Sequence, residues 1–171
     1  MANLRSLSLA YLVSLTLILG GCKEDAPPAE PKAQDTWFPI QIGSVQLKVQ
    51  VMVRNMELQQ GLMHRAMLGE NEGMVFVYPD PGGRSFWMRN TLIPLDIGFF
   101  SPDGVLSEVR AMNPLDETPV TSYSSNIQFA IETNQGWYHD HDVKPGAKLD
   151  MKALKDAIVA RGFDPKALGM N

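Results

Sequence analysis

The stretch SVQLKVQVMV, residues 44–53, places Val or Leu at every second position and mostly polar side chains between them. Successive side chains of a β-strand point to opposite faces of its sheet, so this alternation predicts a strand with one buried face and one exposed face. The stretch is long enough for a full strand, and it indicates that the chain builds its core on a sheet.

Outward from this stretch, the sequence alternates between short apolar runs and turn-forming residues. Turns are expected at PDPGG, residues 79–83, and at SPDG, residues 101–104. Helices are expected over 55–63, with Asn55 as the cap, and over 152–161, where Gly162 ends the apolar pattern. Further strands are expected over 73–78, 85–88, 95–100, 105–112, 127–132 and 147–151. This pattern predicts a mostly β fold, a small β-sandwich or barrel-like domain with one or two short helices and a C-terminal helix.

Composition limits the classes of protein that the chain can belong to. It has 171 residues, 44% of them hydrophobic and 20% charged, with a net charge of −4. These values exclude a disordered chain, a collagen-like repeat and a polytopic membrane protein. The mild acidity argues against nucleic acid as a partner.

The N-terminal residues carry an export pattern. An apolar run over 7–19 follows Arg5 and ends in Gly20-Gly21-Cys22, which resembles the bacterial lipobox. The resemblance implies a signal peptide over 1–21 and a lipid (palmitate) anchor on Cys22 that attaches the protein to the membrane. Lys23 stands where aspartate commonly signals retention at the inner membrane, so we expect the outer membrane, facing the periplasm. The alternative is an accidental cysteine in an uncleaved anchor.

The rest of the chain divides by composition. Residues 22–36 are rich in Pro, Ala and charge, which predicts a lipidated, disordered tether. We expect the β-rich globular domain over 37–151 and a helical extension over 152–171.

Three motifs lie in the globular part: GLMHR at residues 61–65, GMVF at 73–76 and FWMRNTLIPLD at 86–96. Their order and spacing resemble the family known as domain of unknown function 192, with a match over roughly 38–151. The resemblance implies a mostly β domain that is often exported and has no established activity.

The block over 86–96 is the candidate site. It combines aromatic rings with polar groups in irregular backbone, which is typical of a pocket for a small polar ligand. The alternative is structural: Asn90 and Thr91 would satisfy loop backbone groups, and Asp96 would be a buried partner of Arg65 or Arg89. The candidate ligand-binding residues are Arg65, Trp87, Arg89, Asn90, Thr91 and Asp96.

Metal and cofactor sites are not expected. Thioethers such as those of Met63, Met74, Met88 and Met112 can bind Cu(I), but they also fill irregular cores. The stretch HDHD, residues 139–142, is expected to be a solvated turn rather than a metal ligand set.

No catalytic motif is present. The sequence has no G-x-S-x-G, no H-E-x-x-H, no Walker loop and no dinucleotide-binding glycine pattern. We therefore expect a binding module for an unknown small ligand or envelope protein, without catalytic activity. Two alternatives are a hydrolase of envelope polymers that uses Asp96 with Arg65 or Arg89, and a structural or assembly factor of the envelope.

Overall fold

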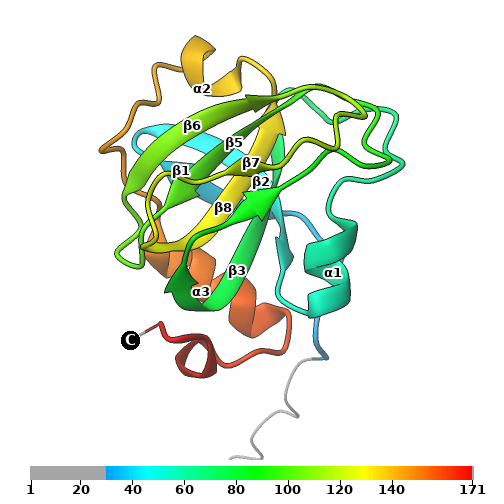
Figure 1. Ribbon diagram of the computed structural model, residues 1–171. Helices are drawn as coiled ribbons and strands as arrows, with labels where there is room; N and C mark the ends of the chain where they lie inside the picture. The colour runs from blue at the N-terminus through cyan, green and yellow to red at the C-terminus, as the bar shows by residue number, and fades with distance from the viewer. Residues whose placement is uncertain (1–29, 171) are drawn as a thin grey trace, which may run out of the picture.

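The computed structural model describes residues 30–170, which form eight strands in two sheets, three α-helices and a 3-10 turn (Figure 1). The expectations for the signal peptide, Cys22 and the first part of the tether lie outside these residues. The strands are β1 (Phe38–Ile42), β2 (Val45–Met52), β3 (Glu72–Gly82), β4 (Ser85–Phe86), β5 (Leu95–Phe100), β6 (Leu106–Met112), β7 (Val120–Thr121) and β8 (Ile127–Asn134). The helices are α1 (Asn55–Gln60), α2 (Trp137–Asp140) and α3 (Met151–Ala160), and the 3-10 turn is η1 (Pro165–Leu168).

The main sheet has six strands in the order β1-β2-β3-β8-β5-β6. Only the β2–β3 pair is parallel, and α1 lies in the crossover between these two strands. The sheet is open, with β1 and β6 at its edges, so this mostly β domain is sandwich-like and not a closed barrel. The predicted fold class is confirmed.

Two hydrophobic clusters lie on the two faces of this sheet. One cluster joins Val49 and Val51 of β2 to Leu154 and Ile158 of α3. The other joins Met52, Phe76 and Phe99 of the main sheet to Phe86 of the small β4–β7 sheet. Because both faces are covered, β5 and most of β8 are buried on both sides, and β5 does not alternate between polar and apolar residues.

Several boundaries differ from the sequence prediction. Strand β1 was not predicted, and residues 147–151 form isolated bridges to Ile42 and Val105 instead of a strand. Strand β3 continues through the predicted turn at 79–83, where its register against β8 shifts between Val77 and Gly82. The shift falls at Pro79 and Pro81, which lack the N–H that a regular ladder needs. Helix α1 ends at Gln60, before the expected Met63, and its cap is Arg54, not Asn55.

The C-terminal helix is confirmed, and it forms one layer of the core. Asp150 caps it by accepting a hydrogen bond from the N–H of Ala153 at 2.9 Å. Leu154, Ala157 and Ile158 are its buried side chains. The segment expected to be an extension therefore contributes to the hydrophobic cluster on one face of the sheet.

Residues 30–36, in the expected tether, make contacts with the domain. The N–H of Lys32 donates to the carbonyl of Ala160 at 2.7 Å, and the Gln50 amide donates to the carbonyl of Asp35 at 2.9 Å. Lys32 also offers its own carbonyl to Arg161 at 3.1 Å. The chain is thus held against α3 several residues before Trp37.

A buried ion pair links the end of α3 to α1. Arg161, which is 2% exposed, donates through Nη2 to Oε1 of Glu57 at 2.5 Å and through Nε to the carbonyl of Val51 at 3.2 Å. Glu57 also accepts from the N–H groups of Val53 and Arg54 at 2.9 and 3.0 Å. Burial raises the pKa of Glu57, but these hydrogen bonds and the guanidinium outweigh it and bring the pKa below 4.5. This pair fixes the position of α1.

Candidate functional site

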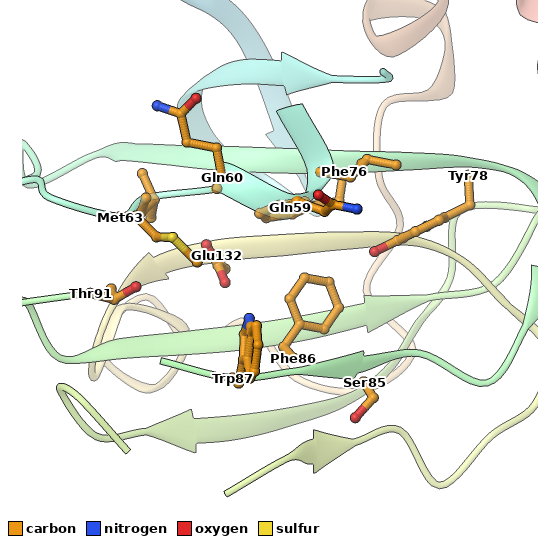
Figure 2. A pocket seen from close by; sticks show the side chains of 13 residues that line it. Gln59, Gln60, Met63, Phe76, Tyr78, Ser85, Phe86, Trp87, Thr91 and Glu132 are labelled. Atoms are coloured by element: carbon orange, nitrogen blue, oxygen red, sulfur yellow. The ribbon is translucent and has the colours of Figure 1, made fainter. Parts of the chain in front are cut away.

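A partly enclosed pocket lies between α1, the strands β3 and β8, and β4, on the sheet face opposite α3 (Figure 2). Its volume is about 170 Å³. It is lined by Leu58, Gln59, Gln60, Gly61, Leu62, Met63, Phe76, Tyr78, Ser85, Phe86, Trp87, Thr91 and Glu132. All three sequence motifs contribute to this wall, so segments far apart in the chain converge on one cavity.

Glu132 is the acidic residue of the pocket. Glu132 is 5% exposed, and no described group donates a hydrogen bond to its carboxylate. Burial alone raises the pKa of this carboxyl to about 8. Buried carboxylates are normally paired or hydrogen-bonded, so an unpartnered one facing a cavity is exceptional.

Aromatic rings form much of the remaining wall. Phe76 and Phe86 meet edge to face with their centroids 5.1 Å apart. Figure 2 shows the indole nitrogen of Trp87 on the side of the ring nearer to Glu132. Burial raises the pKa of Tyr78 to about 12, although Arg84, whose guanidinium lies 3.9 Å from the ring centroid, acts in the opposite direction. Tyr78 is therefore a neutral wall residue at any physiological pH.

Gly61 ends α1 and leaves room for the cavity. It has a φ of +47°, and a Cβ at this position would lie 3.3 Å from Cζ of Phe76 and 3.9 Å from Oε2 of Glu132. The next residue, Leu62, is buried in the cluster beneath. A larger residue at position 61 would be strained and would crowd the space in front of the carboxylate.

A second, shallower hollow of about 510 Å³ adjoins this pocket. We call it the outer groove, and it is lined by Met56, Gln59, Gln60, Met63, His64, Trp87 and Arg89. It shares Gln59, Gln60, Met63 and Trp87 with the inner pocket. Met56 is 82% exposed, so the groove presents apolar surface directly to solvent.

The structure brings only part of the predicted site together. Trp87 and Thr91 line the inner pocket and Arg89 lines the outer groove. Trp87 is 43% exposed whereas its neighbours Phe86 and Met88 are buried, so it is a pocket wall and not a core residue. The Arg89 guanidinium lies 4.0 Å from the Trp87 ring centroid and pairs with Glu117 at 2.6 Å.

Asn90 has a backbone role. Its φ is +55°, a left-handed conformation that Asn tolerates better than most residues, and its carbonyl accepts a hydrogen bond from the N–H of His64 at 2.8 Å. The Thr91 hydroxyl donates to the carbonyl of Arg89 at 3.3 Å. The structural interpretation fits the Thr91 hydroxyl, whereas the bond of Asn90 is made by its backbone carbonyl and not by its side chain.

Arg65 and Asp96 do not join the pocket. Arg65 donates to the Gln50 side chain and lies 5.8 Å from the centroid of Trp37. Asp96 accepts from the N–H of Gly136 at 2.8 Å, while burial and nearby Asp140 hold its pKa above 3.8. The alternative in which Asp96 is a buried partner of Arg65 or Arg89 was wrong, because each of these side chains has another partner.

Glu132 was not predicted as a site residue from the sequence. The strand over 127–132 was predicted from its alternation, and position 132 falls on the more polar side of that pattern. In the structure β8 lies between β3 and β5 and is buried on both faces. The burial of a carboxylate in such a central strand can be recognised only after the neighbouring strands are known.

The residues considered as metal ligands lie apart. Within residues 30–170, no group of three or more His, Cys, Asp or Glu side chains is placed to hold a metal ion. His139 is 92% exposed beside Asp140, and the His141 ring stacks on Trp137 with centroids 4.7 Å apart. The thioethers of Met74, Met88 and Met112 are buried in the hydrophobic cluster, where they fill space.

Comparison with known proteins places the chain in a family. Residues 38–151 match the family DUF192, described as "Uncharacterized ACR", and the chain belongs to this family. No curated protein matches the sequence.

Two solved structures are similar to this domain. One is a protein of unknown function from Novosphingobium aromaticivorans, with 31% identity over 77% of this chain and 99% of that one, and a TM-score of 0.65. The other comes from Sinorhizobium meliloti and was provisionally assigned as a transcription regulator; it has 24% identity over 71% of this chain and 98% of that one, and a TM-score of 0.67. The second likeness concerns the fold alone.

Proposed function

We propose that this protein is a small-ligand-binding module of the bacterial envelope and that the pocket around Glu132 is its binding site. The observation that carries the proposal is the Glu132 carboxyl, which faces a cavity with aromatic walls and has no hydrogen-bond partner among the described residues. Groups left unsatisfied at a cost in stability are typical of functional sites, because a ligand can supply the missing partner. The proposed activity is binding without catalysis.

The geometry gives a hydrolase less support. Glu132 is the single carboxyl among the pocket residues, whereas glycoside hydrolysis commonly uses two carboxyl groups facing each other across the substrate. The specific form considered from the sequence used Asp96 with Arg65 or Arg89, and these side chains have separate partners. The role as a structural or assembly factor would not explain an unpaired buried carboxyl.

The envelope location rests on the N-terminal sequence. The apolar run, the cysteine that follows it and the Pro- and Ala-rich residues after Cys22 support a lipid-anchored protein at the outer membrane, facing the periplasm. Within residues 30–170, no helix is both long and apolar enough to cross a bilayer. A lipid on Cys22 would leave the domain in the aqueous periplasm with its pocket open to diffusing ligands.

The test is a ligand screen with a matched pair of variants. Thermal melts of the wild-type protein are recorded with cationic, neutral and anionic small molecules, and each compound that raises the melting temperature is retested on Glu132→Gln and Glu70→Gln. Glu70 is an exposed acid outside the pocket. We expect the shift to vanish in Glu132→Gln and to persist in Glu70→Gln. Shifts that are equal in both variants, or a complete absence of shifts, would contradict the proposal.

A further inference from the structure

We infer that the inner pocket takes the ammonium group of an organic cation, with the Glu132 carboxylate as its counter-ion and the rings of Tyr78, Phe86 and Trp87 against its alkyl substituents. The inference rests on the proposed binding function and names the class of ligand. The ammonium then lies in the inner pocket, and the rest of the ligand lies in the outer groove.

Charge is the first argument. The carboxylate offers acceptor oxygens to the cavity, and none of residues 30–170 supplies a donor or a cation to them. The two guanidinium groups nearest the walls are engaged elsewhere: Arg84 lies over Tyr78 and donates to the carbonyl of Asp80, and Arg89 lies over Trp87 and pairs with Glu117. A buried carboxylate is costly unless a positive group neutralises it, so a cationic ligand complements this site best.

The walls are the second argument. Aromatic faces carry partial negative charge and attract alkylammonium groups, and aromatic cages are the usual way in which proteins bind such groups. A neutral ligand that accepts one hydrogen bond from protonated Glu132 would not be attracted by the partial negative charge of the aromatic faces. It would also leave the second carboxyl oxygen without a partner. The pocket combines aromatic rings with a carboxylate, and both features favour a cation.

Size is the third argument. The inner pocket measures about 170 Å³, which is room for roughly five or six groups the size of water, at about 30 Å³ each. It is smaller than the roughly 300 Å³ at which pockets begin to hold whole drug-sized ligands. It therefore suits a head group such as trimethylammonium or the end of a lysine side chain. The apolar groove beside it, with Met56 and Met63, suits the attached chain.

Ammonium binding predicts a specific pH dependence. The empty pocket holds Glu132 protonated below about pH 8, so binding a cation must release that proton. Apparent affinity then rises about tenfold per pH unit up to pH 7 and levels off above pH 8. A neutral hydrogen-bond acceptor would show the reverse, because it needs the protonated carboxyl.

The other titratable groups near the site can be distinguished from Glu132 as the source of this pH dependence. Burial holds the pKa of Tyr78 and Tyr138 above 10, so both stay neutral, and the two arginines stay charged. The acids on neighbouring elements include Asp96 of β5, the strand that pairs with β8, and Glu57 of α1 in its pair with Arg161. His64 lines the outer groove, so a His64→Asn variant, which suits its φ of +63°, serves as the control for histidine titration.

The experiment is calorimetric titration of the wild-type protein at pH 6, 7 and 8 with three compounds. Choline represents a free quaternary ammonium, Nα-acetyl-lysine methylamide represents a side-chain ammonium of a partner protein, and 3,3-dimethylbutan-1-ol has the shape of choline without its charge. We expect one of the two ammonium compounds to bind with the stated pH dependence, and the neutral alcohol to bind at least tenfold more weakly. We expect Glu132→Gln to lose at least tenfold in affinity and Trp87→Ala to lose affinity as well, with His64→Asn keeping the pH dependence.

The outcomes separate the two proposals. Equal binding of choline and its neutral analogue, an affinity that falls as pH rises, or no binding of either ammonium compound would overturn the ammonium inference. If the broader screen nevertheless finds a neutral or anionic compound whose binding depends on Glu132, the binding pocket stands and only its ligand class was wrong. If no compound depends on Glu132, both proposals fail. Urea unfolding of each variant confirms that a loss of binding is not a loss of fold.

Discussion

Replacing Glu132 with Gln should stabilise the protein at neutral and alkaline pH. The carboxyl has a pKa of about 8 in the folded state and an ordinary pKa of 4.5 when exposed in the unfolded state. Between these values the folded protein holds a proton that the unfolded protein has released. Stability of the wild-type protein therefore falls as pH rises through this window, and a glutamine cannot contribute to that fall.

The size of the effect follows from the width of the window. One bound proton of difference changes the free energy of unfolding by about 1.4 kcal/mol per pH unit. From pH 5 to pH 8 the stability of wild type relative to Glu132→Gln should therefore decrease by up to about 4 kcal/mol. This is a large share of the roughly 5–15 kcal/mol by which typical domains are stable.

The measurement is urea unfolding at pH 5, 6, 7 and 8, followed by tryptophan fluorescence. The difference between wild type and Glu132→Gln removes the contributions of all other titrating groups, and Glu70→Gln controls for the loss of a charge at the surface. We expect the difference to grow steadily with pH for Glu132→Gln and to stay flat for Glu70→Gln. A flat difference for Glu132→Gln would show that the carboxyl is solvated or partnered in solution and would refute the reasoning on which the pocket rests.

Three further predictions concern other parts of the chain. Arg161→Ala should destabilise the domain by about 3–5 kcal/mol because it removes the buried cation beside Glu57 and leaves only the largely exposed Arg54 as a partner, and the loss should shrink as acid protonates Glu57 below pH 4.5; urea titration at pH 7 and pH 4 measures both. Trp87→Ala should cost clearly less than Phe86→Ala in thermal melts, since Trp87 is 43% exposed and Phe86 is buried, and equal costs would show that the indole is part of the core. Cys22→Ser should yield an uncleaved precursor without lipid by intact mass, whereas a lipid-modified product from this variant would contradict the expected anchor.

Some strands and helices could be predicted from the sequence because the spacing of their own apolar residues shows which of their faces is buried. The alternation over 44–53 indicated β2, the apolar run over 95–100 matched β5, and the spacing of Leu154 and Ile158 indicated α3. Each of these patterns records which face of one element is buried, so it can be identified without knowing the neighbours. The mostly β class followed from them. Strand β1 was missed because its five residues include a proline and only weak alternation.

The candidate site was only half visible in the sequence. The block over 86–96 was identified as unusual, and three of its residues, Phe86, Trp87 and Thr91, line the inner pocket. Arg65 and Asp96 were grouped with them because charged and polar groups beside aromatic residues are typical of a ligand pocket, yet each lies with other partners. Pairing between side chains depends on strand order, and strand order is not a local property.

The sequence by itself determined the local character of many segments: most strands of the main sheet, the C-terminal helix, the export pattern before Cys22 and the family to which the motifs point. Only the tertiary structure decided where a binding site can exist. It placed β8 between β3 and β5, buried Glu132 on a face that the alternation of its own strand marks as polar, and set Gly61, Phe86 and Trp87 around the carboxylate. The physical reason is that the ionisation and partners of a carboxyl depend on the atoms packed around it, and here those atoms come from segments as much as 70 residues away in the chain, roughly the separation between residues 61 and 132.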